Sequence, residues 1–544
     1  MPRIERRMLL GAALAAPAIA TARRSLAQTD NRPVITIAVQ QIVNANALDT
    51  LREQSNVGER VFTSLFETLI GRNHQGRGEM IAQLATQWRR LDDRSVELEL
   101  RRGVLFHNGD ELTAEDVAFS FGPERMFGQP STGQGQGTLF TQTAAARGSG
   151  LPPEVPAVAR RMWPALDRVE AVDRHTVRFV NKVPDVTLEG RIQRYGSEIV
   201  SKRAFLAAES WLAFVQKPVG TGPFRVREFK PDQALVLEAF DGYWGGRPPI
   251  REVRFLVVPE VSSRVNGLLS GQFDFACDLP PDQIAGVERN PRFEVVGGLI
   301  GNHRLIIFDK THPQLADPRV RQAMTHAMDR QAIVDSLWAG RTKVPNGLQW
   351  DYYGDMFHAD WRVPAYDPAR ARDLLRAAGY RGEAIPFRVL NNYYTNQVAT
   401  AQALAAMWNA VGLNVQIQMR ENWQQIFDRS PPRAVRDWSN SAPFADPVSS
   451  IVNQHGPNGQ QQQVGEWTND EFNTLSGELE SSTDPSRRKA VFRRMLEIAE
   501  RDDPAYTVIH QNATFTGKRK DIQWKPAPSF AMDMRGHNFR ISGG

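Results

Sequence analysis

Alternating apolar and polar residues predict three neighbouring strands near the middle of the chain. The runs 224–229, 235–240 and 253–257 repeat the two-residue period of a half-buried sheet. Turn-forming residues at 230–233 separate the first two runs, which is typical of a hairpin. The preceding motif GTGPF, residues 220–224, predicts a sharp bend, because glycine tolerates positive φ and proline fixes φ near a turn value. The segment therefore predicts an antiparallel sheet.

Apolar residues three and four positions apart predict helices in the second half of the chain. Asp317-Pro318 and Asp367-Pro368 each place a capping residue before a proline at the first helical position. A third helix over 398–411 ends before Gly412, and the strand-like run LNVQIQM follows it. A first strand is predicted at 34–39. A chain of 544 residues exceeds what one hydrophobic core usually organises, so at least two domains are expected.

The segment 128–160 breaks the compact pattern. It is rich in glycine, glutamine and serine, and the motif SGLPPEVP adds three prolines, so it predicts a flexible surface insertion. On its N-terminal side, Thr113 and Asp116 have the capping-box spacing that opens a helix. A strand signal returns at 175–180.

The N-terminus has the composition of an export signal. Arg6-Arg7 precede an apolar run too short to span a bilayer, and small residues end at Ala27, so residues 1–27 predict a cleaved signal peptide of the twin-arginine type. This segment holds five arginines and one glutamate, so its removal lowers the formal charge from +5 to +1. Nucleic-acid binding is therefore not expected. Cys277, the single cysteine, excludes an internal disulfide, and no further run is long enough to insert into a membrane.

Several motifs occur in an order that resembles one known family. After GTGPF come YWGGRPPI and VRFLVVPE, and before it stands FHNGDELTAEDV. Two later segments, DPRVRQAMTHAMDRQAIVDSLWAG and YDPARARDLLRAAGY, fit the same pattern. These motifs resemble the extracytoplasmic solute-binding proteins of family 5, the peptide, nickel-chelate and opine receptors of ABC importers.

The resemblance implies a two-lobed α/β periplasmic-binding-protein fold, with a hinge between the lobes and an extra subdomain in the first lobe. It places lobe 1 at 33–297 with the subdomain at about 70–205, lobe 2 at 298–508, and a C-terminal return to lobe 1 at 509–544. It implies a periplasmic protein, a monomer without a cofactor, that captures a small peptide-like, opine-like or metal-chelate-like solute and delivers it to ABC permease subunits.

Two other functions stay open at this point. A ligand-presenting receptor or chaperone that is not coupled to transport would have the same sequence features. A secreted hydrolase is the less favoured alternative, because the chain has no G-x-S-x-G, H-E-x-x-H or Walker A motif. His107, beside Asn108-Gly109 in a strand-to-helix turn, is expected to be structural rather than catalytic.

The ligand site departs from the dipeptide-binding branch that the chain resembles. There an arginine grips the peptide carboxylate and an aspartate grips the ammonium, and these ionic contacts are the strong ones. The arginine position falls here on Asn391, and the aspartate position on Ser441, or on Pro443 if Asp446-Pro447 sets the register. Both clamps are absent, so aromatic and amide groups are expected to dominate the pocket and zwitterionic dipeptides to bind poorly.

Ten residues are therefore the candidates for contact with ligand. They are Trp438, Asn440, Ser441, Phe444, Asn391, Tyr393, Tyr394, Trp423, Asn44 and Asn46. No metal site is expected, and His455 is only a weak candidate, with a surface position favoured for it. Arg304 and Arg436 are expected to face solvent, although either of them, or Asp446, would supply a charge if it entered the pocket.

Overall fold

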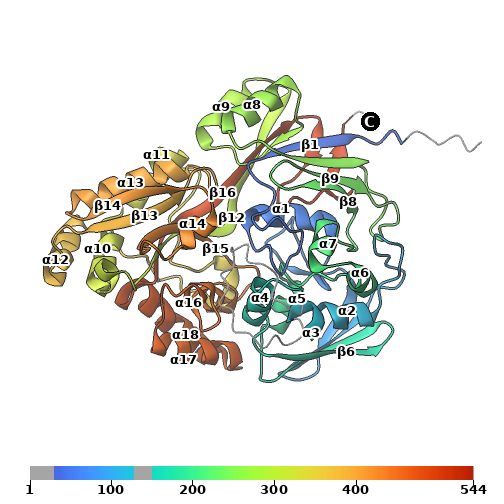
Figure 1. Cartoon of the computed structure of the whole chain (residues 1–544), viewed down its shortest axis with the longest axis horizontal. Coiled ribbons are helices and arrows are strands. Elements are labelled where there is room, and N and C mark those ends of the chain that lie inside the picture. Colours follow the sequence, from blue (N-terminus) through green and yellow to red (C-terminus); the bar gives the residue numbers. More distant parts are fainter. Residues whose placement is uncertain (1–29, 128–149, 543–544) are drawn as a thin grey trace, which may run out of the picture.

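The computed structural model describes residues 30–127 and 150–542, so the predicted signal peptide and residues 128–149 of the predicted insertion lie outside it. A ten-stranded mixed sheet runs through both halves of the molecule (Figure 1). In spatial order its strands are β14 (Asn414–Arg420), β13 (Ala384–Leu390), β15 (Val435–Ser441), β12 (Phe293–Phe308), β16 (Tyr506–Arg519), β11 (Phe275–Ala276), β1 (Val34–Val39), β10 (Glu252–Val257), β9 (Ala234–Ala239) and β8 (Phe224–Lys230). The strands predicted at 34–39, 224–229, 235–240 and 253–257 are confirmed, and β8, β9 and β10 pair antiparallel as predicted.

The long strands β12 and β16 hold the two halves of the sheet together. They pair antiparallel from Phe293 opposite Arg519 to Ile307 opposite Tyr506, with two register shifts between. At one end β16 pairs with β11, and at the other β12 pairs with β15, where Leu305 lies opposite Trp438. Strands far apart in the chain are therefore joined in one sheet, and both lobes are built on it (Figure 1).

The GTGPF bend packs directly against the backbone at the end of α1 (Asn56–Leu65). The Gly222 amide donates to the Leu65 carbonyl at 3.0 Å, and a Cβ on Gly222 would stand 2.6 Å from the Leu65 carbonyl carbon. Gly222 does not have the positive φ that the sequence suggested, so close approach is what requires glycine here. His107 contacts the Gly222 carbonyl oxygen through Nε2 at 3.0 Å, which confirms its structural role.

The extra subdomain is a second, four-stranded antiparallel sheet with helices against it. Its strands, in spatial order, are β4 (Ala85–Arg90), β5 (Ser95–Leu100), β7 (Thr176–Asn181) and β6 (Leu166–Asp173). The predicted capping box opens α2 (Ala114–Ser120): the Thr113 amide donates to Asp116 Oδ2 at 3.0 Å. This motif fixes the helix start because it satisfies a backbone donor that the helix leaves free.

Part of the predicted surface insertion is instead a buried helix, α4 (Glu154–Met162). Its side chains Val155, Val158 and Met162 are fully buried in the subdomain core. The prediction of a flexible surface segment is thus wrong for 154–160. Prolines are tolerated at the start of a helix, so Pro152-Pro153 begin this one rather than preventing it.

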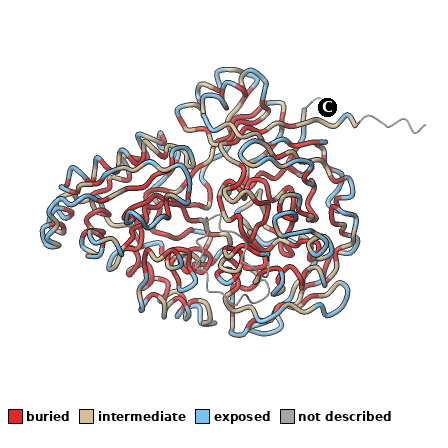
Figure 2. Tube along the Cα trace, viewed as in Figure 1, coloured by how far each residue is buried: buried red, intermediate tan, exposed pale blue. Residues whose placement is uncertain are grey.

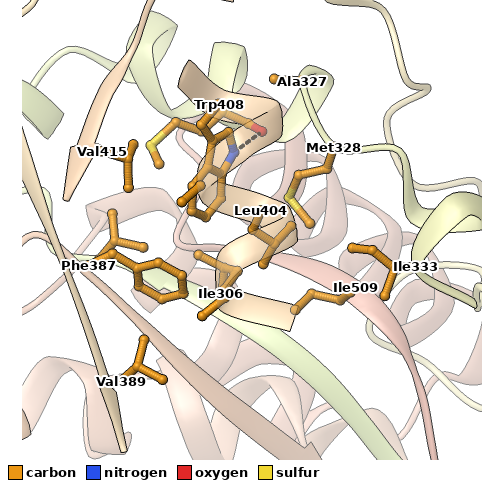
Figure 3. Packing of buried hydrophobic residues seen from close by; sticks show 14 of the residues in the cluster. Ile306, Ala327, Met328, Ile333, Phe387, Val389, Leu404, Trp408, Val415 and Ile509 are labelled. Atoms are coloured by element: carbon orange, nitrogen blue, oxygen red, sulfur yellow. Dashed lines mark hydrogen bonds between the residues drawn. The ribbon is translucent and has the colours of Figure 1, made fainter. Parts of the chain in front are cut away.

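The second lobe surrounds β13–β15 with helices: α10 (Pro318–His326), α11 (Arg330–Trp338), α12 (Pro368–Ala378) and α13 (Gln397–Ala410). These confirm the three predicted helices, and Gly379 ends α12 in the left-handed conformation at φ 69°. Apolar side chains from the helices and the sheet interlock around Trp408, whose Nε1 donates to the Met324 carbonyl at 2.9 Å (Figure 3).

The remaining helices and strands complete the two lobes, and buried residues follow the central strands through both of them, whereas exposed residues lie mainly on outer helices and loops (Figure 2). These elements are β2 (Ile70–Arg72), β3 (Met80–Ala82), α3 (Pro123–Met126), α5 (Leu188–Gln193), α6 (Lys202–Ala207), α7 (Trp211–Gln216), α8 (Val261–Ser270), α9 (Pro281–Glu288), α14 (Trp423–Phe427), α15 (Ile451–His455), α16 (Gln460–Gln463), α17 (Asp470–Ser481), α18 (Pro485–Glu497), β17 (Ile522–Trp524) and β18 (Phe539–Ile541).

Candidate ligand-binding site

A cavity lies between the two lobes, where α1, α4 and α5 face β15 and α16. Figure 1 places α4 and α5 at the boundary between the halves, next to α16. The space open to the centre of a water molecule is about 170 Å³, roughly ten times what one water needs, so the cavity admits a small organic solute and not only an ion.

The second lobe contributes a wall without a single charged side chain, which we call the neutral wall. It consists of Gly301, Tyr393, Tyr394, Trp423, Trp438, Ser439, Asn440, Ser441, Ala442, Pro443, Asn453, Gln454 and Gln460. Its aromatic part is ordered by edge-to-face contacts. The rings of Trp423 and Trp438 lie 4.9 Å apart at 83°, and those of Tyr393 and Trp423 lie 4.9 Å apart at 86°. This geometry is the one that aromatic pairs prefer, and it presents ring faces and edges to a ligand.

All charged groups that line the cavity come from the first lobe and the C-terminal segment, and we call this set the charged wall. Its members are Glu59, Glu67, Arg72, His74, Arg161, Arg194, Glu198 and Arg535. Two of its arginines are already engaged. Arg72 donates to the Pro443 carbonyl at 3.2 Å, and Arg535 forms an ion pair with Asp533 at 3.2 Å.

Like Arg72, Arg161 and Arg194 form no ion pair with a carboxylate in the part of the chain that the structure describes, but unlike Arg72 they donate no hydrogen bond to the neutral wall among those residues. Arg161 lies on α4, is buried, and leaves Nε and Nη1 without a hydrogen-bond partner among the described residues. Burial alone lowers its pKa to about 10. Arg194 follows α5 and donates only to the Tyr195 carbonyl; burial, and then the charge of Arg161, lower its pKa to about 9. A buried guanidinium without a paired carboxylate is costly, so these two arginines are candidates for holding an anion.

The carboxyl groups of the charged wall are held toward their neutral forms. Burial raises the pKa of Glu198 to about 7, although its carboxylate accepts a hydrogen bond from the Gly196 amide at 2.8 Å. Burial likewise raises the pKa of Glu59 and of Glu67, and Glu67 also accepts hydrogen bonds from Tyr243 and Trp244. The described lining contains four arginines and three glutamates, so its formal charge is positive even with every carboxyl group ionised.

Hydrogen bonds connect the lobes around the cavity. Asn56, in the first turn of α1, donates to Ser439 Oγ on β15 at 2.9 Å. Asn44 donates to the Tyr393 hydroxyl at 3.4 Å, and the buried carboxylate of Glu53 fixes the loop that carries it by accepting from the Asn44 and Ala45 amides at 2.7 Å each. These contacts hold the two walls against each other.

Seven of the ten residues proposed from the sequence line this cavity: Trp438, Asn440, Ser441, Tyr393, Tyr394, Trp423 and Asn44. Three do not line it. Phe444 packs against Gly190, and Asn391 lies in a neighbouring groove. Asn46 lies in a loop with a positive φ of 51°, and its carbonyl oxygen accepts a hydrogen bond from the Gln216 side chain.

The four charged or titratable residues considered beside these ten all lie outside the cavity. His455 is fully buried against Tyr506 and Trp467, so the surface position expected for it is wrong. Arg304 and Arg436 are also buried, each in an ion pair, with Asp437 and Glu466 respectively. Asp446 forms a two-pronged pair with Arg488 at 2.8 and 2.9 Å. Arg304, Arg436 and Asp446 face inward because each has an oppositely charged partner there, which the sequence did not reveal, whereas His455 is buried with neither ring nitrogen hydrogen-bonded among the described residues.

The expectation of a neutral pocket holds for one wall only. Arg161 and Arg194 were missed because α4 was taken for a surface loop and because arginine is usually exposed. A signal was present in VARRMW, where Arg160-Arg161 follow the apolar positions of α4 and only the second can point inward with them.

Among the described residues, no group of three or more His, Cys, Asp or Glu side chains is arranged to hold a metal ion, and no helix is long and apolar enough to cross a membrane.

Residues 79–460 match the family model of the bacterial extracellular solute-binding proteins, family 5. The chain belongs to this family. It is a non-catalytic, extracytoplasmic substrate-binding protein of the kind that serves ABC importers. It is 26% identical over 477 residues to the dipeptide-binding protein of Escherichia coli (strain K12), covering 82% of this chain and 84% of the relative. It is also 26% identical to heme-binding protein A of Haemophilus influenzae, covering 80% of each.

A solved structure supports the fold. The dipeptide-binding protein from Pseudoalteromonas sp. SM9913, in complex with Met-Leu, superposes with a TM-score of 0.80 over 93% of this chain and 100% of its own, at 20% identity. The family 5 member described here therefore has the two-lobed α/β fold that the motifs predicted.

Proposed function

We propose that this family 5 protein captures a small solute that carries at least one carboxylate and delivers it to the permease subunits of an ABC importer. The observation that carries the proposal is the pair Arg161 and Arg194, which are buried in the cavity wall and form no ion pair with a carboxylate among the described residues. A guanidinium binds a carboxylate through two parallel hydrogen bonds, so one acidic group would satisfy both the charge and the free donors.

The solute remains one of the three kinds that the motifs suggested: peptide-like, opine-like or metal-chelate-like. The relatives are named for ligands as different as a dipeptide and heme, so their names do not fix it. The aromatic groups Tyr393, Trp423 and Trp438 favour a solute with an apolar or planar part that lies against the neutral wall.

The ligand-contacting set of this proposal is the seven sequence-derived residues that line the cavity, together with the two arginines. The lobe boundaries proposed from the motifs, 33–297, 298–508 and 509–544, remain part of the proposal, with the extra subdomain at about 70–205 supplying Arg161 and Arg194. The protein would work as a monomer without a cofactor.

Native mass spectrometry of the protein purified from its own periplasm tests the ligand class, because tight receptors retain their ligand. We expect a retained solute with a carboxylate. Calorimetry would then compare the solute with its methyl ester, which should bind at least about tenfold more weakly, the equivalent of about 1.4 kcal/mol. A retained solute without any acidic group, or an ester that binds equally well, would contradict the proposal.

We also propose export through the twin-arginine route, which rests on Arg6-Arg7 before the alanine-rich apolar run. Changing both residues to lysine should leave precursor in the cytoplasm, measured by fractionation and immunoblotting. Unchanged periplasmic yield in that strain would exclude this route while leaving the ligand proposal untouched.

A further inference from the structure

Three amide side chains on the neutral wall lack partners among the described residues. Asn440, at the end of β15, is 2% exposed, yet neither Oδ1 nor Nδ2 forms a hydrogen bond. Gln460, the first residue of α16, is 4% exposed and leaves Nε2 free, and Asn453 on α15 leaves Oδ1 free. Buried polar groups are nearly always hydrogen-bonded in folded proteins, so three free ones in a single cavity indicate a missing partner.

Asn440 differs from the serines on either side of it in its hydrogen bonding. Asn440 lies opposite His303 in the antiparallel pairing of β15 with β12, so its backbone cannot turn the side chain away. Ser439 and Ser441 flank it, and their hydroxyls already accept hydrogen bonds, from Asn56 at 2.9 Å and from Asn302 at 2.7 Å. The serines are therefore occupied within the protein, whereas Asn440 is available to a ligand.

The same wall offers no charge to an ammonium group. The carboxylates nearest to Asn440 along the chain are Asp437 and Asp446, and arginines neutralise both: Arg304 pairs with Asp437 and Arg488 with Asp446. Neither carboxylate lines the cavity. An ammonium placed here would lose its hydration without gaining a counter-charge, which costs several kcal/mol.

We propose that Asn440, Asn453 and Gln460 form a subsite for a neutral group that both donates and accepts hydrogen bonds, such as an N-acyl amide, a carboxamide or a hydroxyl. This inference rests on the proposed function, because the neutral group belongs to the same solute whose carboxylate would bind Arg161 and Arg194. The preferred solute is then an acid whose other end is neutral, in contrast to a zwitterionic dipeptide. Amide side chains suit such a group, since each supplies a donor and an acceptor.

Three matched probes test this: Ala-Phe, N-acetyl-Ala-Phe and N-acetyl-Ala-Phe amide, measured by calorimetry on the full mature chain. We expect the N-acetylated acid to bind at least about tenfold more tightly than either of the others, a difference of about 1.4 kcal/mol. Repeating the series with glycine and leucine in place of phenylalanine removes dependence on one side chain.

The outcomes separate this inference from the proposed function. If the acetylated amide binds as tightly as the acetylated acid, the carboxylate proposal fails. If the acids bind but free Ala-Phe equals or exceeds its acetylated form, only the present inference fails. If no acetylated acid binds at millimolar concentration, the proposed amide subsite is also wrong.

A substitution provides an independent readout. Asn440→Asp adds a carboxylate to the neutral wall and should shift the preference toward free Ala-Phe by roughly tenfold. Asn458→Asp is the matched control, because Asn458 is an exposed residue of the same lobe that does not line the cavity. Circular dichroism and thermal unfolding establish that both variants fold. An unchanged preference in a folded Asn440→Asp protein would contradict the subsite.

Discussion

The buried arginines near the two walls of the cavity differ in whether a carboxylate pairs with them. Behind the neutral wall, three arginines of the second lobe are buried in ion pairs and do not line the cavity. Arg304 pairs with Asp437, Arg436 with Glu466, and Arg433 with Asp309 at 2.9 Å. On the charged wall, Arg161 and Arg194 are equally buried but have no such partners in the described chain. These three arginines near the neutral wall are therefore paired within their own lobe, whereas Arg161 and Arg194 are not paired with a carboxylate.

This difference distinguishes arginines that stabilise the fold from arginines that are available to a ligand. A buried ion pair that is complete holds its own lobe together and offers nothing to a ligand. A buried arginine without a carboxylate partner lowers the stability of the unliganded protein. An anion that binds there supplies the missing partner, so it both binds and stabilises the fold. The proposed function therefore assigns charge selection to the first lobe, and stacking and neutral hydrogen bonding to the second.

Removing the incomplete charges should have the largest effect. In the variant Arg161→Gln with Arg194→Gln, we expect the retained ligand to bind at least about a hundredfold more weakly, because each hydrogen bond to a charged group contributes about 1.5–3 kcal/mol. Thermal unfolding should show an unchanged or raised Tm, since two uncompensated buried charges are removed.

Arg160→Gln is the control for this experiment, because Arg160 is the exposed neighbour of Arg161 on the same helix. It should change neither affinity nor Tm. If the double variant keeps its affinity, or unfolds at a much lower temperature, the two arginines serve the fold and the contrast between the walls disappears.

Removing an aromatic side chain from the neutral wall should have the next largest effect. Trp438→Ala should weaken binding by about 2–4 kcal/mol, the range for a buried aromatic anchor. Calorimetry measures this loss, and the fluorescence of Trp438 should respond to ligand in the unaltered protein. Because Trp438 also packs in the lobe core, Trp438→Phe is compared with Trp467→Phe, whose side chain is buried away from the cavity. Only the first should weaken binding.

The titration of Glu198 should modulate the charged wall more modestly. With its pKa raised to about 7, Glu198 is mostly protonated at pH 6 and mostly ionised at pH 8. The ionised carboxylate lies near Arg194 and competes with an acidic ligand, so binding takes up a proton and affinity should fall as pH rises. We expect a roughly three- to tenfold loss between pH 6 and 8. In Glu198→Gln the affinity should no longer change between pH 6 and 8. If the change persists in this variant, another group causes it.

Loosening the contact between the walls should have the smallest effect. Asn56→Ala removes the 2.9 Å hydrogen bond to Ser439, and such neutral bonds contribute about 0.5–1.5 kcal/mol. Ligand should therefore bind up to roughly tenfold more weakly. Stopped-flow kinetics should place the change in the dissociation rate, because the bond forms as the lobes meet. A double-mutant cycle with Ser439→Ala should show that the two losses are not additive.

The sequence by itself determined the local structure and the family. Strand periods, the Thr113–Asp116 capping box and the Asp-Pro helix starts depend on residues a few positions apart, so they were predicted and are confirmed. The order of the family motifs further predicted two lobes, which the matching fold bears out. The same motifs directed attention to Tyr393, Trp423 and Trp438, all of which line the cavity.

Only the tertiary structure decided which charges are free. Arg161 and Arg304 are both buried arginines, and no property of their neighbours in sequence shows that the second has Asp437, 133 positions away, while the first has no carboxylate partner among the described residues. Whether a buried polar group is satisfied depends on contacts between segments far apart in the chain. Short-range patterns fix helices and strands, but satisfaction of charge and hydrogen bonds is settled only when the lobes pack.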